Sequence, residues 1–299
     1  MTRMRSAFAT AIFLLTITAC KSHEHVAYSA SAGHIYPTVS YLDIKLDAHG
    51  NLPSNPYILE FKNGKKEIIF CGTNHPDRRD TGNKMYKIIE KKFFEVWPDI
   101  SVNEGGDVSR KKYTSKGDAI QKNGEIGLIK VLADSLRIKC INGDMTDSLE
   151  FKGLLKYYTK AEFLSYIVTE RFMWMISGMN IKDSTEVTKM YSKFINDYIM
   201  KEGGVKLNPE EQTLAFYKAS YKNLLHRPFN LETLEPTNPF DPKGKFQQIG
   251  RRSKELRDQA LLKKIDDLLN SYDKVFVVFG GWHLMTCKPG LQEIIMKKR

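Results

Sequence analysis

The chain has 299 residues, of which 41% are hydrophobic, and its formal net charge at pH 7 is +11. This length and apolar fraction are sufficient for a sizeable core, so we expect one large folded domain or two small ones and not a disordered chain. The lysines are scattered beside acidic residues and form no basic stripe with interleaved aromatic residues. Nucleic acid is therefore not expected as a partner.

The first 19 residues have the pattern of a secretory signal sequence. Arg3 and Arg5 give a basic start, and residues 7–19 are apolar without a charged side chain. A membrane-spanning helix needs about 20 apolar residues, so this run is too short to cross a bilayer. We expect it to be removed from the mature protein.

Cys20 follows the apolar run directly. The sequence Ile17-Thr18-Ala19-Cys20 resembles the lipobox at which bacterial lipoproteins are cleaved and diacylated. We therefore expect a lipid anchor on Cys20 in the bacterial cell envelope, although an ordinary signal peptide followed by an unrelated cysteine would look the same. Residues 20–50 would then form a tether. Its histidines favour a solvated linker over the alternative, a metal site: His23, His25 and His34.

Apolar runs separated by turn and helix signals predict an α/β domain over residues 51–299, with a central, mostly parallel sheet. Residues 57–61 and 67–71 flank an Asn63-Gly64 turn and predict a hairpin whose first strand lies at the edge of the sheet. Alternating strands and helices follow, as in βαβ units. These further elements are a helix over 84–96, a strand over 100–103, a helix over 127–136, a strand over 137–142, a helix from about 253 to 271 and a strand over 274–279.

A large helical insertion is expected at about residues 146–250. Within it, residues 163–179 are apolar enough to resemble a membrane helix, but Glu170 and Arg171 fall in the middle, where charges are costly in lipid. This favours a buried helix of a soluble domain. The aromatic residues of the insertion favour core packing over the alternative, the lining of a substrate cleft. Residues 226–250 carry four prolines and are interpreted as an active-site lid or as a disordered connection.

Three cysteines remain after Cys20, and they show no CxxC spacing: Cys71, Cys140 and Cys287. This is no disulfide framework, and at most one pair can form.

Three segments share one local design, in which an apolar strand ends, glycine permits a tight turn and a polar side chain follows. They are Gly72-Thr73-Asn74-His75, Asn103-Glu104-Gly105-Gly106 and Gly280-Gly281-Trp282-His283. The carboxyl ends of strands in an open α/β sheet are where ligands bind, so His75, Glu104 and His283 are predicted to converge there.

Two imidazoles and one carboxylate suit a divalent metal such as manganese, cobalt or zinc and leave positions open for water and substrate. Such a metal lowers the pKa of bound water to about 7 and polarises a carbonyl group. Without metal, Glu104 and a histidine would act on water as a general base. Both routes predict a hydrolase. The chain contains no Gly-x-Ser-x-Gly, HExxH, P-loop or Gly-x-Gly-x-x-Gly motif, so the classes of protein that they mark are not supported.

These motifs, with Arg257-Asp258 on a predicted helix and Pro289-Gly290-Leu291 after the last strand, resemble the TraB/GumN family. That family is related to the Tiki proteases and more distantly to erythromycin esterase and the haem-binding lipoprotein ChaN. The resemblance implies an α/β fold of two related halves, with His75, Glu104 and His283 at the active centre. It also implies Arg257 as a charge-stabilising side chain, a role for which Arg251 and Arg252 are the alternatives. Trp282 replaces a small residue of many relatives and would narrow the pocket.

The resulting hypothesis is an extracytoplasmic, membrane-tethered hydrolase, metal-dependent and peptidase-like, that acts on a peptide or another small carbonyl substrate. His75 and His283 would bind metal or activate water, Glu104 would be a ligand or general base, and Arg257 would stabilise the oxyanion. One alternative is a lipoprotein that binds haem or another small molecule in the same cleft without catalysis. Another is a family member that has lost the metal and serves as a cell-surface interaction protein.

Overall fold

The structure is a computed structural model that describes residues 34–45, 52–179, 181 and 183–298. The predicted signal segment, Cys20 and most of the predicted tether lie outside the described residues. Tyr36–Arg299 forms one compact unit, which begins earlier than the predicted domain boundary at residue 51. The boundary prediction was wrong because Tyr36 and Tyr41 are only 6% and 1% exposed and belong to the folded unit.

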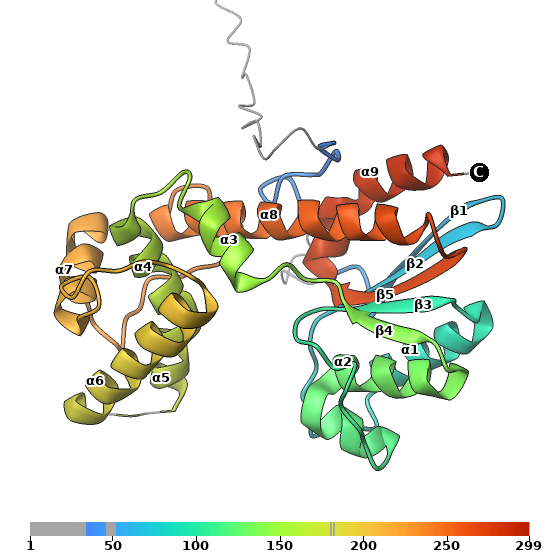
Figure 1. Ribbon diagram of the computed structural model, residues 1–299, viewed down its shortest axis with the longest axis horizontal. Coiled ribbons are helices and arrows are strands. Elements are labelled where there is room, and N and C mark those ends of the chain that lie inside the picture. The colour runs from blue at the N-terminus through green and yellow to red at the C-terminus, as the bar shows by residue number, and fades with distance from the viewer. Residues whose placement is uncertain (1–33, 46–51, 180, 182, 299) are drawn as a thin grey trace, which may run out of the picture. The chain divides into compact units, whose positions relative to one another are not determined.

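The predicted α/β class is confirmed (Figure 1). The elements are, in chain order, β1 (Tyr57–Asn63), β2 (Lys66–Thr73), α1 (Lys84–Val96), β3 (Ile100–Asn103), α2 (Lys116–Leu136), β4 (Lys139–Asn142), α3 (Asp147–Leu154), α4 (Lys160–Val168), the π-helical turn η1 (Thr169–Met173), α5 (Trp174–Gly178), α6 (Ser184–Lys193), the π-helical segment η2 (Phe194–Glu202), α7 (Leu214–Leu225), α8 (Lys245–Leu268), β5 (Lys274–Gly280) and α9 (Gly281–Lys297).

The sheet has the strand order β1-β2-β5-β3-β4. β1 is antiparallel to β2, and the other neighbours are parallel. The predicted hairpin and the position of its first strand at the edge are therefore confirmed. β5 is separated from β2 and β3 by most of the chain, yet it lies between them. The parallel core is thus assembled from both ends of the sequence.

Successive residues of the central strands are buried on opposite faces of the sheet. Ile68 and Phe70 of β2 pack into the core beneath α8 and α9, whereas Ile69 and Cys71 pack into the core beneath α1 and α2. Figure 1 shows these helix pairs on the two sides of the strands. A parallel sheet covered on both faces requires apolar residues at nearly every strand position, which explains the continuous apolar runs in the sequence.

Three elements begin two or more residues away from their predicted starts. α2 begins at Lys116 because Gly124, with φ of 58°, kinks one continuous helix whose second part alone was predicted. β4 begins at Lys139 because Arg137, also with positive φ, caps α2. α8 begins at Lys245 because its first turns also bury side chains, on the face of the helix that lies against the helical insertion.

The helical insertion runs from α3 to α7 between β4 and β5, as predicted. No helix in the described part of the chain is long and apolar enough to cross a membrane. Residues 163–179 divide into α4, η1 and α5, and Arg171 donates to Glu150 over 2.7 Å. The end of this segment is less buried than predicted, because Trp174 is 44% and Met179 58% exposed.

The aromatic residues of the insertion form core contacts. Phe172 packs against Tyr191, and Tyr221 packs against both Tyr217 and Phe246. All five side chains are buried. The three described cysteines are buried and free: Cys71, Cys140 and Cys287.

Candidate active site

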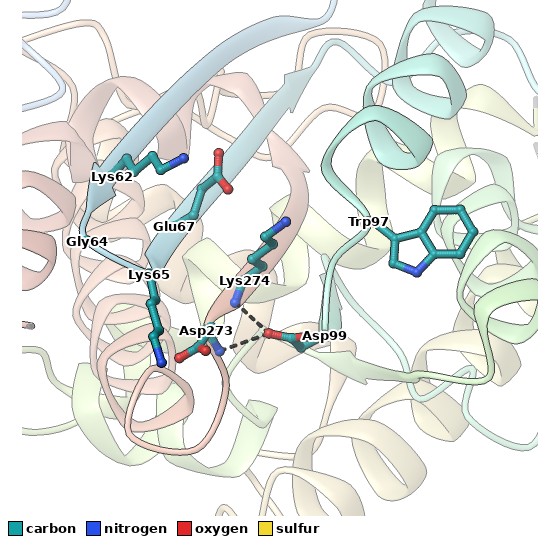
Figure 2. A pocket seen from close by; sticks show the side chains of 8 residues that line it. All are labelled: Lys62, Gly64, Lys65, Glu67, Trp97, Asp99, Asp273 and Lys274. Carbon is teal, nitrogen blue, oxygen red and sulfur yellow. Dashed lines mark hydrogen bonds between the residues drawn. The ribbon is translucent and has the colours of Figure 1, made fainter.

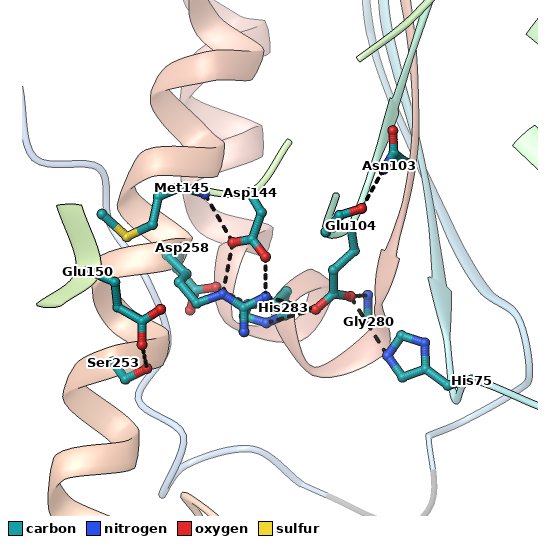
Figure 3. A network of polar contacts seen from close by, with 12 residues as sticks. His75, Asn103, Glu104, Asp144, Met145, Glu150, Ser253, Asp258, Gly280 and His283 are labelled. Atoms are coloured by element: carbon teal, nitrogen blue, oxygen red, sulfur yellow. Dashed lines mark hydrogen bonds and ion pairs between the residues drawn. The ribbon is translucent and has the colours of Figure 1, made fainter. Parts of the chain in front are cut away.

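The carboxyl ends of β2, β5 and β3 bring the three predicted motifs to one edge of the sheet. In the register of the parallel strands, Thr73 is opposite Gly280 and Asn103 is opposite Val278. His75, Glu104 and His283 follow these ends within a few residues, so they converge although they are far apart in sequence (Figure 3).

Glu104 lies at the centre of the group. Its Oε2 atom is 3.8 Å from Nε2 of His75, and its Oε1 atom is 3.7 Å from Nε2 of His283. The backbone N–H of Gly280 donates to Oε2. The chain can turn away directly after Glu104 because Gly105 and Gly106 adopt φ of 70° and 66°, a region that favours glycine.

His283 is held by a contact on the side of its ring that points away from Glu104. It lies in the first turn of α9 and is 4% exposed. Its Nδ1 atom contacts Oδ1 of Asp258 on α8. Because this carboxylate accepts a hydrogen bond from Nδ1–H, Nε2 is the ring nitrogen that faces Glu104.

His75 has the same kind of partner but a more open position. Its Nδ1 atom contacts Oε1 of Glu125, a 6% exposed residue of α2, and its own side chain is 58% exposed. The hydrogen bond to Glu125 raises the pKa of His75 above its usual value, against the lowering effect of partial burial. The backbone of His75 has φ of 47°, an unfavourable conformation for a residue with a Cβ that recurs at functional sites.

Arg257 connects Glu104 to a second carboxylate. Its Nη2 atom lies 3.0 Å from Oε1 of Glu104 and 2.6 Å from Oδ2 of Asp144, and its Nε atom lies 2.8 Å from Oδ1 of Asp144. The predicted alternatives point elsewhere, since Arg251 donates to the carbonyl groups of Pro239 and Asp241 and Arg252 pairs with Glu255. Of the three arginines, Arg257 is thus the one in contact with Glu104.

These charges keep Glu104 ionised. Burial alone would raise the pKa of its carboxyl, but the positive charges of His283 and Arg257, with smaller effects from other neighbours, lower it to about 2. A carboxylate with so low a pKa is a weak base at neutral pH. Its chemistry is that of a fixed negative charge, and a histidine beside it can accept a proton only in its neutral form.

The three side chains face a small space beside Gly280. A Cβ placed on Gly280 would lie 2.9 Å from Oε2 of Glu104, 3.5 Å from Nε2 of His75 and 3.6 Å from Cδ2 of His283. Within the described residues, no three His, Cys, Asp or Glu side chains form a ready-made metal cluster. The side chains nevertheless fit a small divalent cation in this space. They provide one ionised carboxylate and two imidazoles, each of which is hydrogen-bonded to another carboxylate through Nδ1.

Three carboxylates of the centre were not predicted as site residues: Glu125, Asp144 and Asp258, of which Asp258 was named only as part of the motif of the family resemblance. Asp144 follows β4 in Asn142-Gly143-Asp144, which repeats the design of a strand end, glycine and polar residue, so this signal was present in the sequence. Glu125 gave no such signal, because it lies within a helix and reaches His75 only through the kink at Gly124.

Two pockets found among the described residues lie away from this centre. One, of about 380 Å³, lies at the amino ends of β2 and β5, where the Asp99 carboxylate accepts hydrogen bonds from the backbone of Asp273 and Lys274 (Figure 2). The other, of about 520 Å³, lies in the helical insertion and is lined by Met173, Leu214 and Phe229 among others. Neither contains a predicted site residue.

No family model and no curated protein matches the chain. The resemblance to the TraB/GumN family therefore stays a prediction.

Proposed function

We propose that the protein is a hydrolase tethered to the bacterial cell envelope through Cys20, with a peptide or another small carbonyl compound as its substrate. One observation carries the proposal: two imidazoles with carboxylate-bound Nδ1 atoms face a single ionised carboxylate, Glu104, at the carboxyl edge of a parallel sheet. This arrangement provides two proton acceptors beside a fixed negative charge.

In the route without metal, the Nε2 atom of His75 or His283 accepts a proton from water as the water oxygen bonds to the substrate carbonyl carbon. The carbon–nitrogen or carbon–oxygen bond then breaks, and the same imidazole returns the proton to the leaving group. Asp258 and Glu125 stabilise the positive charge that forms on their imidazole partners. His75 is the more exposed of the two and faces incoming substrate.

A second route uses a divalent cation such as manganese, cobalt or zinc, with His75, Glu104 and His283 as its ligands, so that the histidine Nε2 atoms would bind the cation and would not accept a proton. When bound, it would supply Lewis-acid polarisation of the carbonyl and a lower pKa for water. Glu104 contributes the negative charge that offsets part of the charge of such a cation. The low pKa of Glu104 means that this charge is present throughout the neutral range.

Arg257 has two proposed roles. It holds Glu104 in place by bridging it to Asp144. Its Nη1 atom takes part in none of the hydrogen bonds found among the described residues, so it is the atom that we assign to the developing oxyanion.

The test is hydrolysis of p-nitrophenyl acetate and of a mixture of synthetic peptides by the full chain in oxygen-labelled water. We expect label in the carboxylate product of the parent and a loss of at least tenfold in rate, or about 1.4 kcal/mol, in the His75→Ala/His283→Ala variant. His226→Ala is the matched control, because this histidine is exposed at the end of α7. Equal rates in the parent and the double variant would contradict the proposal. A Soret absorption band without hydrolysis would favour the haem-binding alternative.

A further inference from the structure

Residues 36–45, here termed the N-terminal strap, are held between α8 and α9. The backbone N–H of Tyr36 donates to Gln259 over 3.0 Å, and the amide of Gln259 donates back to the Tyr36 carbonyl over 2.9 Å. The N–H of Val39 donates to the carbonyl of Thr286 over 2.9 Å. The strap thus has defined contacts with the two helices that carry Asp258 and His283.

Tyr41 projects from the strap into the interior beside His283. Its side chain is 1% exposed, and its hydroxyl oxygen lies 3.1 Å from Oδ2 of Asp258 and 3.2 Å from Nδ1 of His283. Since the Nδ1 proton is directed to Oδ1 of Asp258, the Tyr41 hydroxyl donates to Oδ2 of the same carboxylate. Burial raises the pKa of Tyr41 well above its usual value, so the hydroxyl keeps its proton.

Asp258 is 1% exposed, so its carboxylate needs hydrogen-bond donors from the protein. A buried carboxylate is costly unless hydrogen bonds replace its lost water. Oδ1 accepts from His283, while Oδ2 accepts from Tyr41 and, over 2.7 Å, from the hydroxyl of Thr286. Two donors on Oδ2 prevent the carboxylate from rotating, which leaves Oδ1 aligned with the imidazole.

We propose that Tyr41 is a positioning residue of the active site: its hydroxyl fixes the Asp258 carboxylate, which fixes the ring orientation and tautomer of His283. The consequence for rate rests on the proposed function, but the positioning itself does not. The site is thus completed by a segment that precedes the sheet and lies within the predicted tether. Part of the orientation of His283 depends on a chain segment that leads directly to the proposed lipid anchor.

The chain offers a matched pair of variants. Tyr41→Phe removes one hydroxyl and keeps a ring that packs against Phe240, with centroids 6.0 Å apart. Tyr36→Phe removes a hydroxyl from the same strap that also donates to an aspartate of α8, Asp266, over 2.7 Å. Only the first of these two hydroxyl groups contacts the partner of His283.

The primary readout is the low-field imidazole N–H proton resonance of His283 in the full chain labelled with nitrogen-15 histidine. It is assigned by its loss in His283→Gln. We expect Tyr41→Phe to broaden or abolish this resonance, because the Asp258 carboxylate gains freedom, and Tyr36→Phe to leave it unchanged. A urea unfolding curve for each variant verifies that the fold is intact.

The second readout is hydrolysis of p-nitrophenyl acetate. We expect Tyr41→Phe to lower kcat about tenfold with little change in KM, which is the size expected for one hydrogen bond to a charged group. An unchanged resonance in Tyr41→Phe, or an equal loss in Tyr36→Phe, would overturn the positioning role. Absence of hydrolysis by the parent protein would count against the proposed function alone, and the resonance would still decide the role of Tyr41.

Discussion

Oε1 of Glu104 and Nη2 of Arg257 lie 3.0 Å apart although 153 residues separate them in the chain. The contact joins the end of β3 to α8 and places a partly buried guanidinium beside the carboxylate that faces both histidines. Its consequence is electrostatic, because Arg257 is one of the charges that lower the pKa of Glu104 to about 2. Glu104 is thereby an anion under all ordinary conditions.

This pKa predicts how Glu104 affects acid stability. A folded-state pKa of about 2, against an ordinary value of 4.5, contributes stability that is present above pH 4.5 and is lost as the pH falls through 2. The contribution is about 3 kcal/mol at neutral pH. We expect the urea-unfolding free energy of the parent to fall by about that much more than that of Glu104→Gln between about pH 6 and pH 2.

The control for this comparison is Glu95→Gln, whose side chain is 50% exposed and pairs with Lys91 at a distance of 3.7 Å. It is expected to follow the parent. If the unfolding free energy of Glu104→Gln fell with pH as much as that of the parent, the pKa of Glu104 would not be lowered in the folded state.

Glu125 is predicted to set the pKa of His75. A folded pKa above 6.5 means that the pair contributes stability that is fully present below pH 6.5 and is lost as the pH rises through the folded value. Nuclear magnetic resonance titration of His75 in metal-free protein should give a pKa above 6.5 in the parent and a lower one in Glu125→Gln. Glu90→Gln, which removes only a contact with Lys116, should leave the titration unchanged. An equal His75 pKa in the parent and in Glu125→Gln would contradict the pairing of His75 with Glu125.

The sequence allowed the sheet and its site-bearing edge to be predicted, because both depend on local patterns. The bounds Lys84–Val96 and Ile100–Asn103 agree with the prediction, since a helical period and a short apolar run are separated there by a clear break. The convergence of His75, Glu104 and His283 followed from a general rule, that parallel strands end at a shared edge.

The partners of these residues could not be predicted in the same way. Glu125 reaches His75 through a kink at Gly124, and Tyr41 reaches Asp258 from a segment that resembles a linker in composition. Such contacts depend on how distant elements pack, and no spacing in the sequence encodes them. Arg257 was expected near Glu104 because of the family resemblance and not because of periodicity, and its role in a reaction stays a prediction.

Gly280→Ala is predicted to disturb the centre by filling the space between its side chains. The backbone of Gly280, with φ of −54°, accepts alanine, but the new Cβ would lie 2.9 Å from Oε2 of Glu104. We expect a loss of about 1–3 kcal/mol in unfolding free energy, together with reduced hydrolysis. Gly178→Ala is the control, since nothing lies within 4 Å of its added Cβ. Equal stability and activity in the two variants would show that the space is larger than described.

Arg171 is predicted to be essential for the stability of the helical insertion. It donates to Glu150, whose side chain is 3% exposed, over 2.7 Å. Arg171→Met would leave that charge in the core with a serine hydroxyl, from Ser253, as its remaining donor, so we expect a cost of about 3–5 kcal/mol in urea unfolding. Arg79→Met removes an arginine that is 90% exposed and should leave the urea-unfolding free energy close to that of the parent. Similar values for both would contradict a buried charge network in the insertion.

The central claim is that His75, Glu104 and His283 form one metal-binding hydrolytic centre. Its most direct test is elemental analysis of the full chain, purified without chelator, beside the His75→Ala/His283→Ala variant. We predict about one equivalent of manganese, cobalt or zinc in the parent and a loss of that metal in the variant. Absence of metal from both proteins, with no binding when each of the three metals is added back, would contradict the claim.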